Sequence, residues 1–318
     1  RESISREQSR EVKTMQKDTV VILDFGSQYN QLIARRVREC KVYSVLIPYN
    51  TPIEKIKSYN PKAIILTGGP ASVMEKGSPK ADPRIFKLGV PILGICYGMQ
   101  FTAYVLGGKV GRSKKREYGY AELVLNKRER FFTGFQKKEK VWMSHGDKVQ
   151  EKPKGFIVLA HTKNSHIASM ADPVRKIYGV QFHPEVIHTP KGMQIFKNFL
   201  YDIASLKPTW TMASFIKNSI EEIKNKVRNE RVVLGLSGGV DSSVAAILLH
   251  RAIGPRLHCI FVDNGLLRKY EREYVENTFK KHFHVNLHVA KSERRFLRRL
   301  KGVIDPERKR KIIGNEFI

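Results

Sequence analysis

The sequence predicts an α/β protein with two domains, each built on a mainly parallel β-sheet flanked by helices. Short apolar runs rich in β-branched residues alternate with helix-patterned segments, and glycine-rich turns follow several of these runs. The alternation stops near residues 206–209 and then starts again. Because 318 residues are enough for two cores, we expect domains over 19–207 and 208–318, after a flexible extension over 1–18.

The first domain is expected to begin with parallel βαβ units. Strands are predicted at 19–24, 42–47, 63–66 and 91–95, with helical segments at 28–38, 53–58 and 83–88. Between 109 and 182 the pattern changes to short, antiparallel-looking strands at 121–125, 141–143, 156–161 and 177–182, followed by a helix at 190–204. In parallel sheets, ligands bind at the carboxyl ends of the strands, where Gly26, Gly68, Gly69 and Cys96 all fall.

The second domain repeats the α/β pattern. Helices are predicted at 211–228, 240–253 and 268–283, and strands at 231–236, 257–263 and 285–289. Only three strands are readable before residue 318, and the sequence does not start with Met. We therefore expect a chain cut from something longer, with a second domain that is incomplete at its C-terminal end.

Composition limits the classes of function. Lys and Arg number 58 against 30 Asp and Glu, a net charge of +28, which attracts polyanions or else forms a lysine-rich solvated surface. Cys40, Cys96 and Cys259 lie far apart, which indicates a reducing compartment without disulfides or a zinc site. No apolar run approaches the ~18 residues of a membrane span.

Cys96 is the candidate nucleophile. It sits in Gly94-Ile95-Cys96-Tyr97-Gly98, a G-x-C-x-G elbow between a predicted strand and helix, where the helix N-terminus favours a thiolate. His183 and Glu185 lie two residues apart on an extended segment, so the carboxylate can orient the imidazole. Backbone N–H groups of Gly69 and Tyr97 would form the oxyanion hole. The alternatives are a buried core cysteine and a satisfied core histidine.

These motifs resemble the class I (triad-type) glutamine amidotransferase family. The resemblance spans about residues 19 to 205 and rests on Gly68-Gly69-Pro70, the Cys96 elbow, Met143-Ser144-His145-Gly146-Asp147 and His183-Pro184-Glu185. It implies a flavodoxin-like fold and a cysteine that attacks the side-chain amide of glutamine, giving a glutamyl thioester and ammonia. It also implies that residues 143–147 form a loop that helps to hold glutamine. The implied glutamine-binding residues are Gly68, Gln100, Ser144, His145, Gly146 and Asp147.

A second motif, Ser237-Gly238-Gly239-Val240-Asp241-Ser242-Ser243, joins a predicted strand to a helix. Its N–H groups and hydroxyls suit an anion, although a glycine turn that caps the helix is the alternative. The motif resembles the pyrophosphate loop of the N-type ATP pyrophosphatase family, which implies an adenine-nucleotide α-hydrolase-like fold and ATP with Mg²⁺. The implied ATP-binding residues are Gly235, Ser237, Gly238, Gly239, Val240, Asp241, Ser242, Ser243 and Val262, with Asp241 as the metal contact.

Together the two halves resemble the glutamine-hydrolysing GMP synthetase family, through residues 24–29, 261–268 and 305–314. That family implies a cytoplasmic ligase of purine biosynthesis that uses glutamine, ATP and xanthosine monophosphate (XMP), and a homodimer formed through a C-terminal domain. For this chain we expect glutaminase and ATP-loop functions only, with no membrane or nucleic-acid partner. The alternatives are another ATP-pyrophosphatase amidotransferase, such as NAD synthetase, and a polyanion-binding derivative of the fold.

Overall fold

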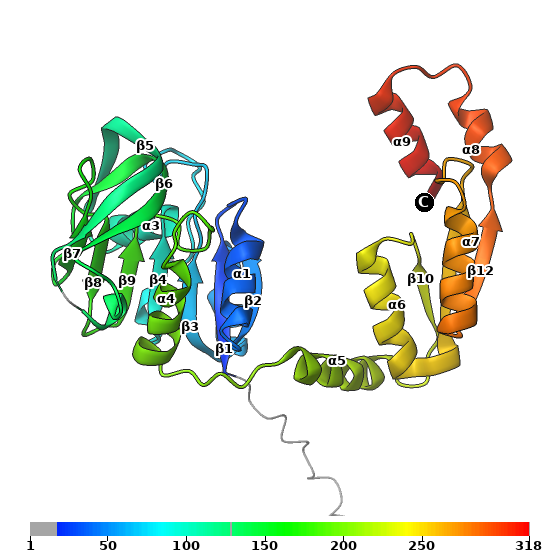
Figure 1. The fold of residues 1–318 in the computed structure, drawn as a ribbon, viewed down its shortest axis with the longest axis horizontal. Coiled ribbons are helices and arrows are strands. Elements are labelled where there is room, and N and C mark those ends of the chain that lie inside the picture. The colour runs from blue at the N-terminus through cyan, green and yellow to red at the C-terminus, as the bar shows by residue number, and fades with distance from the viewer. Residues whose placement is uncertain (1–17, 128, 318) are drawn as a thin grey trace, which may run out of the picture. The chain divides into compact units, whose positions relative to one another are not determined.

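The computed structural model describes residues 18–127 and 129–317, so the expected extension over 1–18 lies outside the described residues except for Asp18. The chain divides into two compact units, with the boundary between Trp210 and Thr211. Each unit contains a β-sheet flanked by helices (Figure 1), which confirms the α/β class.

The first unit is organised around a nine-stranded sheet with strand order β2-β1-β3-β4-β9-β8-β7-β5-β6 among the described residues. The first five strands in this order are parallel, in the arrangement typical of flavodoxin-like folds. They are β2 (Tyr43–Pro48), β1 (Thr19–Asp24), β3 (Pro61–Leu66), β4 (Ile92–Ile95) and β9 (Ile177–Val180). The other four are antiparallel: β8 (Ser169–Asp172), β7 (Ile157–His161), β5 (Lys109–Leu125) and β6 (Lys138–Glu151).

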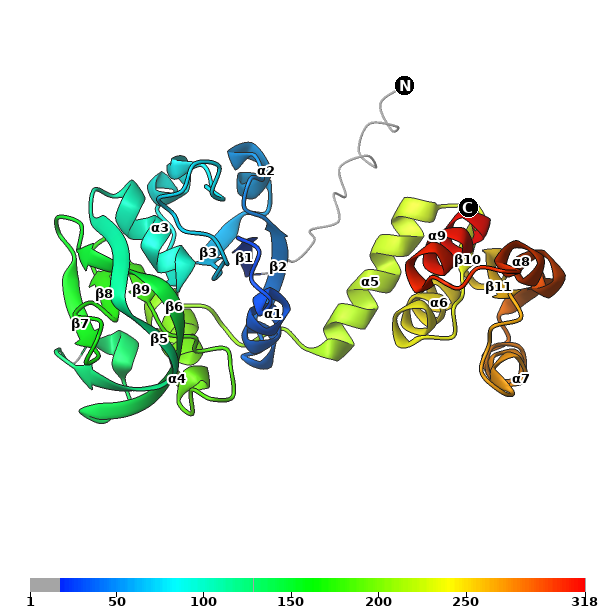
Figure 2. The ribbon, with the colours of Figure 1, turned by 90° about the horizontal axis from the view of Figure 1, so that it is seen from above.

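Helices cover both faces of the parallel part of the sheet. The side chains along β1 show why, because they alternate between two buried cores. Val20 and Ile22 pack into one core and Val21 and Leu23 into the other, because successive side chains of a strand point to opposite faces. α1 and α4 lie on one side and α2 and α3 on the other (Figure 2). The helical segments are α1 (Asn30–Glu39), α2 (Ile53–Ser58), the 3₁₀ turns η1 (Pro83–Lys87) and η2 (Arg130–Phe132), α3 (Tyr97–Val105), α4 (Gly192–Lys197) and the π-helical η3 (Asn198–Ile203).

The antiparallel part differs from the sequence prediction. The strands expected at 121–125 and 141–143 are parts of the long hairpin β5–β6, and residues 143–147, expected as a loop, lie inside β6. β8, with sequence Ser-Met-Ala-Asp, was not expected because it has no β-branched residue. Its residues are buried between β7 and β9, where pairing with neighbouring strands outweighs local propensity.

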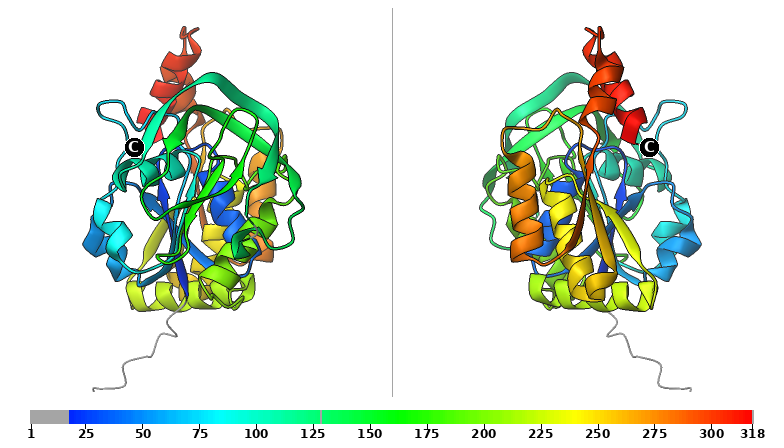
Figure 3. Two further views of the ribbon diagram at one scale, coloured as in Figure 1. Left: turned by 90° about the vertical axis from the view of Figure 1, so that its left-hand side faces the viewer. Right: turned by 90° about the vertical axis from the view of Figure 1, so that its right-hand side faces the viewer.

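The second unit has a three-stranded parallel sheet, β10 (Val232–Gly235), β11 (Leu257–Asp263) and β12 (Asn286–Lys291), among the described residues (Figure 3). One face of β11 is buried through Leu257, Cys259 and Phe261. The helices are α5 (Met212–Val227), α6 (Val240–Ile253), η4 (Gly254–Arg256), α7 (Glu271–Glu276) with η5 (Asn277–His282), α8 (Glu293–Leu300) and α9 (Pro306–Phe317). α8 was not expected, and the helix expected at 268–283 begins at Glu271.

Candidate active site

Cys96 lies at a sharp turn between β4 and α3, with φ of 51° and ψ of −104°, a strained conformation for a residue with a side chain. Two close backbone contacts make glycine necessary on both sides of the turn. A Cβ on Gly98 would lie 2.3 Å from the Leu66 carbonyl oxygen, and one on Gly94 would lie 2.6 Å from the Gly98 carbonyl oxygen. The turn is therefore a nucleophile elbow that presents the thiol at the start of a helix.

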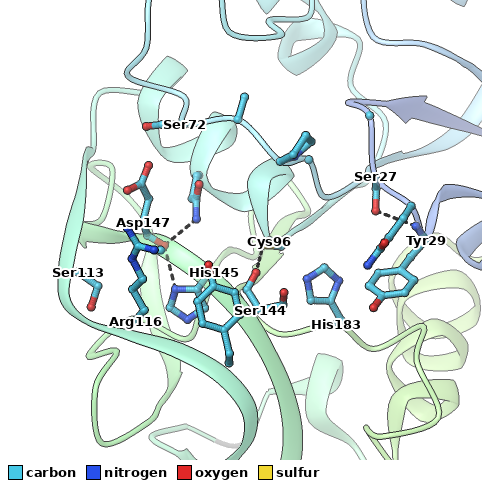
Figure 4. Close-up of a pocket in the computed structure, with 18 of the residues that line it drawn as sticks. Ser27, Tyr29, Ser72, Cys96, Ser113, Arg116, Ser144, His145, Asp147 and His183 are labelled. Carbon is cyan, nitrogen blue, oxygen red and sulfur yellow. Dashed lines mark hydrogen bonds between the residues drawn. The ribbon is translucent and has the colours of Figure 1, made fainter.

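His183 and Glu185 follow the end of β9. His183 Nδ1 lies 2.7 Å from Glu185 Oε1, and the Glu185 side chain is fully buried. Arg36 Nε donates to the Glu185 carbonyl oxygen at 2.9 Å, while Thr189 Oγ1 donates to the His183 carbonyl oxygen at 2.7 Å. These contacts fix the segment. His183 and Cys96 line the same cavity (Figure 4), so the sequence-predicted triad is brought together in space.

The surroundings of His183 favour its protonated form. Burial by itself would lower the pKa of His183, but the charges of Glu185 and Cys96 outweigh it and raise this pKa well above its ordinary value. Among the described residues, Glu185 Oε2 is buried without a hydrogen-bond partner. No donor at that oxygen from the described part of the chain therefore weakens the attraction between the carboxylate and His183. The arrangement suits an imidazolium that can give a proton to a leaving group.

The two predicted oxyanion-hole amides lie at neighbouring strand ends. The Tyr97 N–H opens α3, where it has no acceptor within the helix, whereas the Gly98 N–H donates to the Thr67 carbonyl oxygen at 3.0 Å. Gly69 follows β3, and a Cβ there would lie 2.6 Å from the Phe25 carbonyl oxygen. Gly68 lies beside the reacting groups, since its Cβ would be 3.2 Å from His183 Cε1.

The cavity, of about 730 Å³, contains most of the residues expected to bind glutamine. Ser144, His145, Gly146 and Asp147 line it from β6, and Gln100 lines it from α3. The sequence motifs did not single out several other polar residues of its wall. These are the charged Glu75, Arg112 and Arg116 and the phenol Tyr118, whereas Tyr29 of the same wall belongs to the motif at residues 24–29.

Gln181 is a further residue missed from the sequence. Its Nε2 donates to Cys96 Sγ at 3.6 Å, and the side chain is completely buried. The signal was present, because Gln181 and His183 are two residues apart and side chains at that spacing on an extended segment share a face. Cys96 Sγ also lies 3.8 Å from the Ser144 carbonyl oxygen, which can accept the thiol proton.

The predicted ATP loop joins β10 to α6 in the second unit. Gly235 ends the strand, Gly238 has φ of +78°, and Val240 to Ser243 form the first turn of the helix. The loop is held by its own hydroxyls: Ser237 N donates to Ser242 Oγ at 3.2 Å, and Ser243 Oγ donates to the Gly239 carbonyl oxygen at 2.7 Å. Val262 lies on the neighbouring strand β11.

The second unit's candidate metal contact, Asp241, is exposed in the first turn of α6. Within residues 18–127 and 129–317 no group of three or more His, Cys, Asp or Glu side chains is arranged to hold a metal ion. No helix in the described part of the chain combines the length and the apolar character needed to cross a membrane.

A cysteine elbow facing a histidine–glutamate pair at the end of a parallel sheet defines a triad-type thiol hydrolase. Comparison with protein families gives the particular family: the model "Glutamine amidotransferase class-I" matches residues 21–203, and the chain belongs to this family, as the motifs indicated. A second model, "NAD synthase", matches residues 211–271 in the other unit.

Similar proteins match across both units. A GMP synthase (glutamine-hydrolysing) of Carboxydothermus hydrogenoformans is 57% identical over 94% of this chain and 59% of its own length. One of Acetivibrio thermocellus is 55% identical over 96% of this chain and 60% of its own length. The chain thus spans about 60% of these curated relatives. A solved structure from Thermoplasma acidophilum, of a protein described as a candidate component of GMP synthase, is 29% identical with a TM-score of 0.55, covering 59% of this chain and 94% of that one.

Proposed function

We propose that this chain is the part of a glutamine-hydrolysing GMP synthase that releases ammonia from glutamine and binds ATP. The observation that carries the proposal is the cavity lined by Cys96 and His183, in a chain whose second unit carries a glycine- and serine-rich loop between β10 and α6. Relatives named GMP synthase match both units, which supports the pairing of these two functions in one protein. Residues 19–207 and 208–318 are the ranges that we assign to them.

In the proposed glutaminase reaction, Cys96 Sγ attacks the side-chain amide carbon of glutamine as a thiolate. The carbonyl oxygen becomes negatively charged in the tetrahedral intermediate, and the N–H groups of Gly69 and Tyr97 donate to it. His183, held by Glu185, gives its proton to the leaving nitrogen, so that ammonia departs and a glutamyl thioester remains. His183 then takes a proton from the water that attacks the thioester, the C–S bond breaks, and glutamate leaves while the Cys96 thiolate is regenerated.

The charges of the cavity fit an α-amino acid. Arg112 and Arg116 line it together with Glu75 and Asp147, so both signs of charge are present for the carboxylate and the ammonium group of glutamine. Arg116 of β5 and Asp147 of β6 both line the cavity from the β5–β6 hairpin (Figure 4). Ser144 to Asp147, with Gly68 and Gln100, complete the assigned glutamine-binding residues.

In the second unit, the backbone of Ser237–Gly239 and the start of α6 would bind the phosphates of ATP. Asp241 offers an exposed carboxylate next to serine hydroxyls, an oxygen donor set that fits Mg²⁺. Mg²⁺ bound there would neutralise phosphate charge. In the complete enzyme, which we propose to be a cytoplasmic homodimer, ATP adenylates XMP, pyrophosphate departs, and ammonia displaces AMP to give GMP.

The test measures two activities of the chain. We expect ammonia release from glutamine by the purified protein, and saturable ATP·Mg binding measured by calorimetry. Adding ATP·Mg and XMP to the glutaminase assay asks whether the second unit controls the first. The proposal fails if the folded chain releases no ammonia from glutamine with or without the nucleotides.

The match of residues 211–271 to NAD synthase favours one second candidate, an amidase with a different acceptor. The two candidates differ in which acceptor promotes ATP cleavage by the complete enzyme, of which we propose this chain to be a part. In the presence of glutamine and ATP·Mg, pyrophosphate release that depends on XMP supports GMP synthesis. Release that depends instead on an acceptor other than XMP supports the second candidate.

A further inference from the structure

Cys96 Sγ has a polar neighbour that the triad does not use. Gln181 Nε2 lies 3.6 Å from the sulfur, and Gln181 Oε1 accepts from Gln100 Nε2 at 3.3 Å. The Gln100 Nε2 group also donates to the Asp147 carbonyl oxygen at 2.8 Å. A continuous chain of hydrogen bonds therefore runs from the backbone of β6 through two buried amides to the reactive sulfur.

The donor-to-acceptor direction of this series of hydrogen bonds is fixed at the Asp147 carbonyl oxygen. A carbonyl oxygen only accepts, so the Gln100 atom that faces it must be the amide nitrogen. The second N–H of that nitrogen points to Gln181, so Gln181 must turn its oxygen toward Gln100. The remaining end of Gln181, which faces Cys96, is then its NH₂ group. The sulfur is thus offered an N–H donor, which stabilises the thiolate and has no comparable interaction with a thiol.

The Asp147 carbonyl oxygen that fixes this direction is itself contacted by a buried histidine–glutamate pair. His145 Nδ1 contacts the Asp147 carbonyl oxygen at 2.9 Å, and His145 Nε2 contacts Glu117 Oε2 at 3.1 Å. Both ring nitrogens therefore face oxygen atoms, and these two contacts hold the imidazole in place. Glu117 also accepts from Ser165 Oγ at 2.8 Å and from Thr162 Oγ1 at 2.9 Å.

The environment of Glu117 agrees with an ionised carboxylate. Burial alone would raise the pKa of Glu117, but hydrogen bonds from His145, Ser165 and Thr162 lower it below its ordinary value. Glu117 is 7% exposed and His145 is 4% exposed, so water competes little for these contacts. The histidine–glutamate pair of β5 and β6 thus anchors the end of the amide series at the Asp147 carbonyl oxygen.

We propose that Gln181 is a catalytic residue that stabilises the Cys96 thiolate by hydrogen bonding, and that Gln100, His145 and Glu117 are the positioning residues that fix its orientation. The catalytic role of Gln181 rests on the proposed glutamine hydrolysis, but its effect on the Cys96 thiol does not. The reactivity of the thiol can be measured without substrate. The titratable groups around the sulfur are His183, with Glu185 behind it, and those that line the same cavity: Tyr29, Glu75, Arg112, Arg116, Tyr118, His145 and Asp147.

The experiment measures the pKa of Cys96 from the pH dependence of its alkylation by iodoacetamide, followed by peptide mass spectrometry. The mapping separates Cys96 from Cys40 and Cys259, whose thiols are buried and have pKa values raised by that burial. Gln181→Leu and Gln181→Met remove the N–H donor, and Met keeps the unbranched shape in case Leu disturbs folding. We expect both variants to raise the Cys96 pKa by about one unit, the shift given by loss of one hydrogen bond to a charged group.

Two further variants separate orientation from general structural damage. Gln100→Leu leaves Gln181 in place but removes the group that fixes its direction, so we expect a smaller rise in the same pKa. Gln194→Leu is the matched control, because the Gln194 amide donates to Asn198 Oδ1 at 2.7 Å, within the segment formed by α4 and η3. It should leave the Cys96 pKa unchanged.

An unchanged Cys96 pKa in folded Gln181→Met overturns the proposal, as does an equal shift in Gln194→Leu. The outcome is independent of the proposed function. If the wild-type chain releases no ammonia from glutamine but the Gln181 variants shift the thiol pKa, the glutaminase assignment fails and the role of Gln181 stands. If ammonia is released but the Cys96 pKa does not move in the Gln181 variants, the glutaminase assignment stands and the proposed role of Gln181 fails.

Discussion

The Cys96 elbow and the Ser237–Ser243 loop have the same local plan, a strand, a glycine turn and the start of a helix, but they are held in different ways. The elbow is buried and fixed by distant segments: the Cys96 N–H donates to the Val180 carbonyl oxygen at 2.8 Å, and Gln181 contacts the sulfur. The loop is exposed and held by hydroxyls within its own seven residues. Changes at Cys96 should therefore affect chemistry and changes at the closely packed glycines of the elbow should affect stability, whereas changes in the loop should affect ligand binding alone.

The largest effect is expected for Cys96→Ala. Loss of the nucleophile should reduce ammonia release from glutamine by about 10⁴-fold or more, to background. The thermal unfolding midpoint should change little, because alanine keeps the Cβ and removes only one sulfur atom. Ammonia release is measured by a coupled assay and folding by circular dichroism. Activity that survives in a folded variant would show that another residue is the nucleophile.

Glu185→Gln should have a smaller effect, about 10²–10³-fold on kcat/KM, because the amide can still contact His183 Nδ1 without its charge. The negative charge helps to raise the pKa of His183, so the variant should lose the imidazolium at a lower pH. The alkaline limb of the pH–rate profile of ammonia release should therefore move to lower pH. A limb that stays in place would contradict the role assigned to this carboxylate.

A pair of glycine substitutions compares the two regions by stability. Gly98→Ala places a Cβ 2.3 Å from the Leu66 carbonyl oxygen and should lower the free energy of unfolding by about 3 kcal/mol. Gly235→Ala, at the end of β10, meets no atom within 4 Å and should be neutral or slightly stabilising. Chemical denaturation followed by circular dichroism measures both. Equal destabilisation by the two changes would show that the elbow and the end of β10 do not differ in how tightly they are packed.

Gly239→Val tests the loop through its ligand. A Cβ at Gly239 is 3.4 Å from Ser237 Oγ, an ordinary contact, so the folded state should accept a side chain. The side chain would keep phosphates from the backbone N–H groups, and loss of about 2 kcal/mol of hydrogen bonding should weaken ATP binding about 30-fold. Calorimetric titration with ATP·Mg measures the affinity, and glutaminase activity without nucleotides serves as the control. Unchanged ATP affinity would contradict the assignment of this loop.

The smallest effect is expected for Glu117→Gln. Because the pKa of Glu117 is lowered in the folded chain, its charge contributes stability above the ordinary glutamate pKa, and this contribution is lost as pH falls through the lowered value. The variant should lose about 1.5 kcal/mol at neutral pH and less under acid conditions. Tryptophan fluorescence during urea unfolding reports the first unit, because Trp142 and Trp210 both lie in it. A loss of stability that does not depend on pH would contradict the charge-based explanation.

The sequence by itself was sufficient for the parallel βαβ elements and for both motifs. The strand at 19–24, the helix at 53–58 and, in the second unit, the helix at 240–253 and the strand at 257–263 have the observed bounds. Their signals are local, since a β-rich run or a periodic apolar pattern lies within the segment that forms the element. Cys96, His183 and Glu185 could also be predicted from local signals, because the elbow motif and the two-residue spacing each lie within a short stretch of sequence.

Only the tertiary structure decided the rest of the site. The length of the β5–β6 hairpin, the existence of β8 and the contacts of Glu117 with His145, Thr162 and Ser165 depend on segments up to 48 residues apart. A polar residue such as Glu117 or Gln181 reads as a surface residue when it is considered alone. It becomes part of the site because burial removes water, and each of its polar atoms must then find a partner that only the folded chain supplies.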